Sequence, residues 1–332
     1  MMSETNKPTK GLWKQVDILK LLDSLYKYGL YGILIVLVIL FSSINKNFLS
    51  VNNARNLLLQ TSSSGIAAAG LVFVMITGGI DISIGATIFI SAVISAALTD
   101  LGLNLVGAIG VSLAVGALIG TVNGFLIAKM NMVPLIVTLA MQYILRGFAI
   151  GIIGIRTLFF NNDVGKYLVR TKIFDFVPLL VIILIIVIII TQFILSRTLY
   201  GRHIYAIGNN RTGAEKIGIK VKNSVWIAYI ICGALAGLSG LVSGAQVGAI
   251  SPTFATGQEF IIISSTVLGG VSLFGGRGKV FPNAFIGVLI IMCIENGLVM
   301  AKTNMYAYTI VRGCIIFIAV MLDSVKNKGE TR

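Results

Sequence analysis

The stretch FVPLLVIILIIVIIITQFIL (residues 176–195) contains no charged residue, and only Pro178, Thr191 and Gln192 interrupt its hydrophobic side chains. An α-helix rises 1.5 Å per residue, so about 20 residues cross the roughly 30 Å hydrocarbon core of a bilayer. The stretch therefore predicts a transmembrane helix, and it sets the expectation for the rest of the chain.

The composition extends this prediction to the whole protein. Of the 332 residues, 56% are hydrophobic and only 11% are charged, whereas soluble domains carry about 25% charged residues. We therefore predict an all-α polytopic membrane protein. About ten transmembrane helices are expected, at residues 28–44, 56–77, 83–99, 104–128, 134–154, 176–195, 224–246, 260–274, 280–300 and 306–323.

The distribution of lysine and arginine predicts the orientation of these spans. With the N-terminus inside, the cytoplasmic segments carry 17 of these residues and the outer loops carry 7, as the positive-inside rule requires. We expect cytoplasmic ends at residues 1–27 and 324–332, on either side of a transmembrane domain at 28–323. The first apolar run follows a long polar lead and has no small-residue cleavage site, so we interpret it as a retained anchor and not as a signal peptide.

Several other functions are excluded. The net charge of +14 resides in loops that alternate with spans, so it does not form a basic face for nucleic acid. Cys232, Cys293 and Cys314 lie in apolar segments without the C-x-x-C spacing. We expect small buried hydrophobic residues there, and neither a disulfide nor a metal site.

Residues 199–223, LYGRHIYAIGNNRTGAEKIGIKVKN, form a long basic island between two apolar spans. The spacing of Thr212 and Glu215 matches the capping box S/T-x-x-E, which predicts a helix that begins at Thr212. Gly218 then supplies the helix stop. This segment is the candidate contact with another protein.

The predicted helix is far shorter than the roughly 12 residues that an isolated helix needs in water, so it must pack against something. It is expected to present Ala214 and Ile217 on one side, flanked by Arg211 and Lys216. Packing on the chain's own membrane domain and docking on a partner are both open at this point.

Two glycine-rich elements resemble each other, TGGIDISIG at 77–85 and LGGVSLFGG at 268–276, which suggests a parallel duplication of a helical unit. Their glycines either allow close helix packing or act as flexible elbows of a gate. Asp81 and Ser83 are expected to cap the helix that starts there. The glycines concerned are Gly78, Gly79, Gly85, Gly269, Gly270, Gly275 and Gly276.

The sequence GGRGK at 275–279 is not a phosphate-binding loop. The pattern GxxxxGK[ST] fails because Leu273 stands at the first glycine position and Val280 follows the lysine. We therefore expect no ATP site in this chain.

Ionisable residues inside predicted spans are functional candidates by default. Arg146, Glu295 and Arg312 are such residues, and a Glu295–Arg312 pair joined by Asn296 is one interpretation. Snorkelling of Arg312 and a polar path are the alternatives. With one histidine in the chain, and no cluster of carboxylates among these intramembrane residues, a proton- or sodium-coupled carrier is disfavoured.

The loop at 155–175 contains Arg156, Lys166, Arg170 and Lys172. These cations are suited to acidic residues on an extracytoplasmic partner. A solvated loop near lipid headgroups explains them equally well.

Four segments in family order carry a resemblance that covers residues from about 30 to 325. Residues 201–219 resemble the cytoplasmic coupling segment of ATP-binding-cassette importer permeases of the ribose/galactose/xylose branch. Residues 78–85, 267–278 and 316–323 resemble further elements of the same family. At Glu259 the family usually continues Glu-Leu-Asp-Ala, whereas this chain continues Phe260-Ile-Ile-Ile, so the transported sugar is left open.

The resemblance implies a machine with several subunits in the plasma membrane of a prokaryote. A separate ATPase subunit binds ATP, an extracytoplasmic binding protein delivers a monosaccharide, and a second permease copy or a paralogue completes the path. The chain itself would bind no cofactor. By this resemblance the coupling positions are Gly201, Tyr205, Gly208, Ala214, Glu215 and Gly218.

The function that this implies is the permease subunit of an ATP-driven importer of a ribose-type sugar. One alternative is the same machine for another small polar solute, such as a furanosyl autoinducer. The other is a secondary carrier that works alone.

Overall fold

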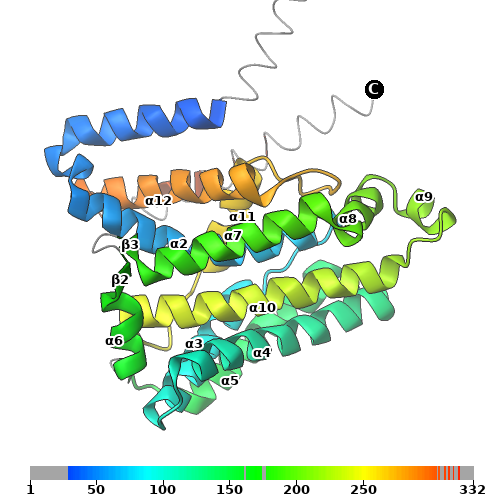
Figure 1. Cartoon of the computed structure of the whole chain (residues 1–332), viewed down its shortest axis with the longest axis horizontal. Helices are drawn as coiled ribbons and strands as arrows, with labels where there is room; N and C mark the ends of the chain where they lie inside the picture. The colour runs from blue at the N-terminus through cyan, green and yellow to red at the C-terminus, as the bar shows by residue number, and fades with distance from the viewer. Residues whose placement is uncertain are drawn as a thin grey trace, which may run out of the picture.

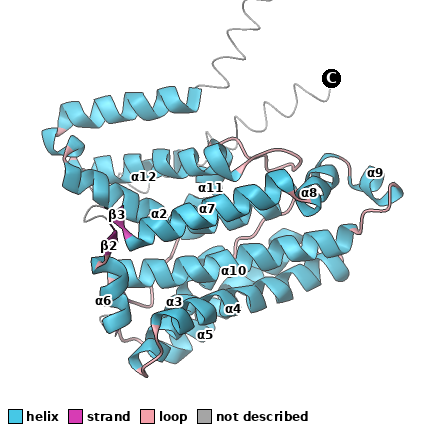
Figure 2. Cartoon of the chain, in the orientation of Figure 1, coloured by secondary structure: helices cyan, strands magenta, loops and turns pink. Residues whose placement is uncertain are grey.

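The computed structural model describes residues 29–160, 162–173, 177–304 and scattered positions between 306 and 321. The described part is a bundle of helices with a few very short strands (Figures 1 and 2). The predicted ends at 1–27 and 324–332, the position of Arg312 and most of the tenth predicted span lie outside the described residues.

The helices that follow the N-terminal helix Gly29–Ile44 are η1 Lys46–Leu49, α2 Val51–Ile76, α3 Ile84–Asp100, α4 Leu105–Gly124, η2 Phe125–Lys129, α5 Pro134–Ile153, α6 Asp163–Arg170, α7 Leu179–Arg197, α8 Leu199–Asn209, α9 Arg211–Lys216, α10 Val221–Val247, α11 Gln258–Leu268, η3 Val280–Ala284 and α12 Phe285–Met300. The strands form two antiparallel pairs, β1 Leu158–Phe159 with β4 Ala249–Ile250, and β2 Lys172–Ile173 with β3 Val177–Pro178.

Six of the described helices are long and apolar enough to cross a membrane, and three more apolar helices are shorter. The six are Val51–Ile76, Leu105–Lys129, Pro134–Ile153, Leu179–Arg197, Val221–Val247 and Val280–Met300. The prediction of a polytopic helical membrane protein is thus confirmed, and α7 coincides with the apolar run from which the prediction began.

The predicted span at 260–274 is wrong in its extent. Its helix, α11, has 11 residues and ends at Leu268. Gly270 follows with φ +95°, a left-handed conformation that ends helices. At 1.5 Å per residue α11 is about 16 Å long, roughly half of the hydrocarbon thickness. It is a half-helix, and it does not span the membrane alone.

The helix α10 runs through the middle of the bundle and contacts α2, α3 and α4 (Figure 1). Its contact with α4 is made by the backbones themselves. A methyl group added to Gly116 would lie 2.0 Å from the carbonyl oxygen of Gly233, and one added to Gly120 would lie 2.2 Å from that of Tyr229. Because lipid removes the hydrophobic force between helices, such small-residue contacts hold membrane bundles together.

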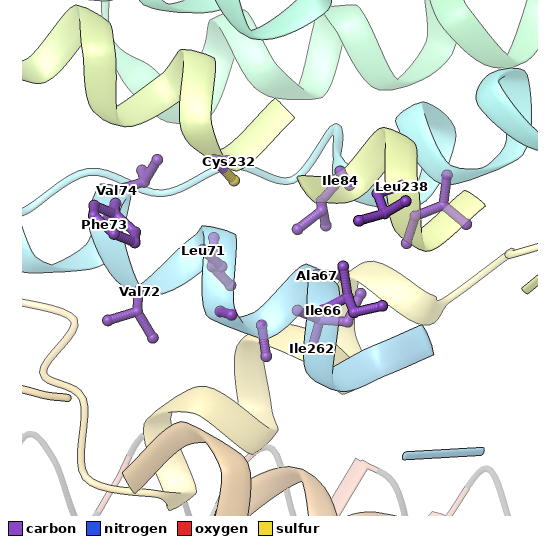
Figure 3. Packing of buried hydrophobic residues seen from close by; sticks show 14 of the residues in the cluster. Ile66, Ala67, Leu71, Val72, Phe73, Val74, Ile84, Cys232, Leu238 and Ile262 are labelled. Atoms are coloured by element: carbon purple, nitrogen blue, oxygen red, sulfur yellow. The ribbon is translucent and has the colours of Figure 1, made fainter. Parts of the chain in front are cut away.

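The C-terminal part of α2 lies at the centre of the core, where its side chains from Thr61 to Ile76 are all buried. Figure 3 shows Ile84 of α3 and Ile262 of α11 around the part of α2 that carries Ile66 and Ala67. The helices α3 and α11 therefore meet near the middle of the bundle.

The two ends of the bundle differ. One end carries α8 and α9, and the other carries α6 with the strands β2 and β3 (Figure 1). The helix α6 is capped by Asn162, whose side chain accepts the N–H of Gly165 at 3.0 Å, and it packs through Leu168. This helix lies within the loop predicted at 155–175.

We predict that Gly116→Ala lowers the free energy of unfolding by about 1–3 kcal/mol, the usual cost of overpacking a tight contact. The added methyl group would collide with the Gly233 carbonyl on α10. Thermal unfolding of the purified protein in detergent measures the effect. The matched control is Gly110→Ala on the same helix, where no atom of the described residues lies within 4 Å of the added carbon. Equal melting temperatures for the two variants would show that the contact is loose.

Candidate functional site

The first half of the basic island is the helix α8, which the sequence reasoning missed. Thr198 caps it, since its hydroxyl accepts the N–H of Gly201 at 3.2 Å. Gly201, Ile204 and Ile207 are buried. A methyl group at Gly201 would lie 2.2 Å from the carbonyl oxygen of Leu195, so glycine permits the sharp turn from α7 into α8.

Gly208, near the end of α8, lies in a three-way backbone contact. A methyl group there would come within 1.9 Å of the Ile76 carbonyl oxygen and 2.3 Å of the Gly276 nitrogen. The N–H of Gly276 in turn donates to the Ile76 carbonyl at 2.8 Å. We call Ile76, Gly208 and Gly276 the backbone junction. It joins α8 to the end of α2 and to the second glycine-rich element.

Two tyrosines attach α8 to the second glycine-rich region and to α10. The Tyr205 hydroxyl donates to the carbonyl oxygen of Gly278, and that of Tyr200 donates to the carbonyl oxygen of Ser224 at 3.1 Å. Burial raises the pKa of Tyr205, so its hydroxyl stays protonated as a donor. The predicted coupling positions Gly201, Tyr205 and Gly208 thus all contact the chain's own membrane domain.

The capping box predicted at Thr212 and Glu215 is wrong. The N-cap of α9 is Asn210, whose side chain accepts the N–H of Gly213 at 2.8 Å, so the helix already starts at Arg211. Thr212 is an exposed residue inside it. Asparagine caps as well as threonine does, and it comes first in the chain.

The predicted stop at Gly218 is confirmed. This glycine has φ +84°, and its N–H donates to the carbonyl oxygen of Glu215 at 3.0 Å. Ile219 N–H donates to the carbonyl of Ala214, also at 3.0 Å. The two bonds satisfy the last carbonyls of α9, as the Schellman ending does.

Ala214 and Ile217 do not share a face, contrary to the prediction. Ala214 is 3% exposed and packs on its own domain, whereas Ile217 is 75% exposed. Ile217 follows the last residue of α9 and no longer has helical geometry (φ −89°, ψ 14°), which turns its side chain outward. The exposed residues of this region, which we call the coupling surface, are Arg211, Thr212, Glu215, Lys216, Ile217 and Gly218.

At the first glycine-rich element, α2 ends at Ile76 and Gly78 has φ +78°. Asp81 accepts the N–H of Ser83 at 2.9 Å and its hydroxyl at 2.6 Å. Ser83 is the N-cap residue of α3, but its side chain makes no capping bond, so that part of the prediction is wrong. The hydroxyl instead accepts a hydrogen bond from Asn123 at 2.8 Å, which ties the element to α4.

Close packing and left-handed turns both occur at the second element. A methyl group at Gly269 would lie 2.2 Å from the Asn283 carbonyl oxygen, and the Asn283 amide donates to the Gly269 carbonyl at 2.8 Å. Gly275 and Gly276 have φ of +92° and +74°. The element reaches Ile76 through the backbone junction, so both glycine-rich elements lie at the same end of the bundle.

Arg146 on α5 reaches across to the segment before α11. One of its guanidinium nitrogens, Nη1, donates to the carbonyl oxygen of Phe254 at 3.3 Å, and the guanidinium lies 5.3 Å from the centre of the Phe89 ring. Gln142, one turn earlier, accepts the N–H of Ala86 at 3.1 Å and so caps α3 from outside. Gly85 lies beside this contact, in the first turn of α3.

Asn296 takes part in a buried hydrogen bond, in which its side-chain oxygen accepts from Asn53 at 2.9 Å. The Asn53 amide also donates to the carbonyl of Phe48 at 2.9 Å, so the pair joins α12 to the start of α2. The Glu295–Arg312 pair stays a prediction, because Arg312 lies outside the described residues.

Within the described part of the chain, no three His, Cys, Asp or Glu side chains come together as metal ligands. Cys232 and Cys293 are buried, as predicted, whereas Cys314 is exposed, contrary to the prediction. An apolar helix surface that faces lipid accommodates a thiol without burial in protein.

Residues 53–320 match the family described as "branched-chain amino acid transport system / permease component". The chain belongs to this permease family. It is therefore a membrane component of a transport system and not an enzyme, and the ATPase of such importers is a separate subunit.

Individual relatives cover nearly the whole chain. The chain is 35% identical over 305 residues to the ribose import permease protein RbsC of Escherichia coli (strain K12), covering 89% of this chain and 92% of the relative. It is 36% identical over 306 residues to the D-allose transport system permease protein AlsC of the same strain, with 91% and 93% covered. The L-arabinose transport system permease protein AraH of that strain is 32% identical over 303 residues, with 90% and 92% covered. No solved structure matches the chain.

These relatives confirm the resemblance to sugar importer permeases that the sequence motifs indicated. The family description names amino acids, whereas the names of all three relatives contain sugars. Membership of the family alone therefore does not define the solute.

We predict that Gly208→Ala opens the backbone junction, because the added methyl group would overlap the Ile76 carbonyl. Amide hydrogen exchange at Gly276, whose N–H donates to that carbonyl, reports the opening directly. Because this hydrogen bond protects the Gly276 amide, its loss should make the exchange of that amide about tenfold faster. Arg202→Ala, at an exposed position of the same helix, is the control and should leave this exchange unchanged. Unaltered exchange in Gly208→Ala would contradict the tight junction.

Proposed function

We propose that this chain is the permease subunit of an ATP-driven importer of a ribose-type monosaccharide. Relatives whose names state ribose, allose or arabinose cover about nine-tenths of its length, and this observation carries the assignment of solute class. All three are small polyhydroxy solutes of similar size. A permease that transports one of them needs a polar path and no covalent chemistry.

In this proposal the membrane domain has about ten spans and both termini in the cytoplasm of a prokaryotic cell. The excess of lysine and arginine in the segments assigned to the cytoplasm supports this orientation. The end of the bundle that carries α8 and α9 is then cytoplasmic, and the end that carries α6 faces outward.

The coupling surface is the proposed contact with the ATPase subunit. It consists of α9 and the turn after it. The helix has six residues, too few to be stable without tertiary contacts, and the turn exposes an isoleucine next to charged residues. A force applied to α9 is transmitted to α8, which precedes it with only Asn210 between the two helices, and then to the backbone junction. From there it reaches both glycine-rich elements, the proposed elbows of the cytoplasmic gate.

The outward end is the proposed contact with a sugar-loaded binding protein. Arg156, Arg170 and Lys172 are exposed there, and such cations favour an acidic partner surface. A second copy of the chain or a paralogue completes the path, and rigid-body movement of the two bundles alternates its access.

ATP-dependent uptake is the direct test of this function. In proteoliposomes that contain this chain, its ATPase subunit and its binding protein, uptake of radiolabelled ribose, allose or arabinose should require ATP inside the vesicles. Omitting the ATPase subunit should reduce the uptake to the background of empty vesicles. Equal uptake without that subunit would identify a stand-alone carrier and reject the proposal.

A single substitution tests the coupling surface. Ile217→Asp should abolish co-purification with the ATPase subunit and leave the melting temperature within about 2 °C, because this side chain is 75% exposed and surface changes cost little stability. Ile155→Asp is the matched control, since Ile155 is 95% exposed on the connection that follows α5. If both variants retain the ATPase equally, the docking surface lies elsewhere.

A further inference from the structure

Two helices begin opposite each other in the interior of the bundle. α3 begins at Ile84 and α11 at Gln258. At Gly85 an added methyl group would lie 2.2 Å from Oε2 of Glu259 and 3.2 Å from the carbonyl oxygen of Ala255. Since α11 is about half a membrane thickness long, this meeting of helix starts lies near the bilayer mid-depth.

Glu259 is the acidic residue at this meeting. It is 6% exposed, and its Oε2 atom has no hydrogen-bond partner in the described part of the chain. The starts of α3 and α11 and the guanidinium of Arg146 lie near this side chain. They do not occupy the lone pairs of Oε2, and a buried polar atom without a partner is costly.

Two further partnerless atoms belong to residues at the same place. Arg146 uses Nη1 for the Phe254 carbonyl, and its Nη2 has no partner among the described residues. The side-chain oxygen of Gln258, in the first turn of α11, is also buried without a described partner. Within the described part of the chain, one strong donor and two acceptors around the start of α11 thus have no hydrogen-bond partner.

The adjoining surface is unsuited to lipid. Arg146 lies twelve residues into α5, which is about 18 Å from its start. Thr253 and Thr256 are exposed beside the Arg146 contact, together with the aromatic rings of Tyr143 and Phe260. Guanidinium, amide and hydroxyl groups at this depth require a polar space or a polar partner.

We propose that Arg146, Gln258 and Glu259 form a contact site for sugar hydroxyls at mid-depth of the transport path. Each hydroxyl group both donates and accepts a hydrogen bond, so a monosaccharide satisfies Oε2 of Glu259, the Gln258 oxygen and Nη2 of Arg146 together. A cation is disfavoured because a guanidinium lies beside the single carboxylate. This inference rests on the proposed sugar transport and adds the residues that contact the solute.

The test uses the complex of permease and ATPase in detergent without binding protein, with ribose as the probe. Saturation-transfer NMR detects weak contact between the ribose C–H protons and the protein. Glu259→Gln should weaken binding about tenfold, the loss expected for one hydrogen bond to a charged group. Lys302→Gln, an exposed position beyond the end of α12, is the control and should bind as the unmodified protein does.

A second variant distinguishes loss of the sugar contact from misfolding of the protein. Gln258→Leu alters a half-buried side chain and should also weaken ribose binding, while its melting temperature and co-purification with the ATPase are retained. Unchanged ribose binding in folded Glu259→Gln and Gln258→Leu would overturn the site. It would do so even if the unmodified importer takes up ribose in vesicles. Absence of uptake for every sugar in the unmodified importer would instead reject the proposed function on which the site rests.

Discussion

The backbone contact between α4 and α10 is the constraint on which the rest of the structure depends. Gly116 and Gly120 lie against α10 with no side chain between them. This brings Tyr229 of α10 close enough to donate a hydrogen bond to the Ile80 carbonyl at 3.1 Å, which holds the connection from α2 to α3. The positions of both glycine-rich elements and of α8 therefore depend on how closely two helices approach, and glycine sets that distance.

Hydropathy predicted the helices that the bilayer requires. It did not predict the elements whose position depends on tertiary contacts. The run at 176–195 forms α7 because an uncharged, mostly apolar segment of this length is most stable in the hydrocarbon core. The helix α8 was not predicted because Gly201 and Gly208 are residues typical of loops. Its stability comes from contacts with distant residues, such as the bond of Tyr205 to the Gly278 carbonyl, and a local pattern does not contain them.

The candidate sites show the same division. The stop at Gly218 was predictable because a helix ending is local chemistry. The meeting of Arg146 with Glu259 was not, because more than a hundred residues separate them. The sequence marked Arg146 as an ionisable residue inside a span and Glu259 as the place where the chain departs from the family pattern, but nothing in it linked the two. Gly208 was recognised as a coupling position, but its inward-facing contact appeared only in three dimensions.

The glycines of α4 and α10 also restrict how such a chain can evolve. An α-helix turns by about 100° per residue. One residue inserted between Gly116 and Gly120 would rotate one of them away from α10 and place a side chain in the contact. Substitutions on the outer faces of the two helices are compatible with this contact. Insertions or deletions between the two glycines are not. Relatives should therefore differ in this region by substitution, and their insertions and deletions should collect in the connections outside the bundle.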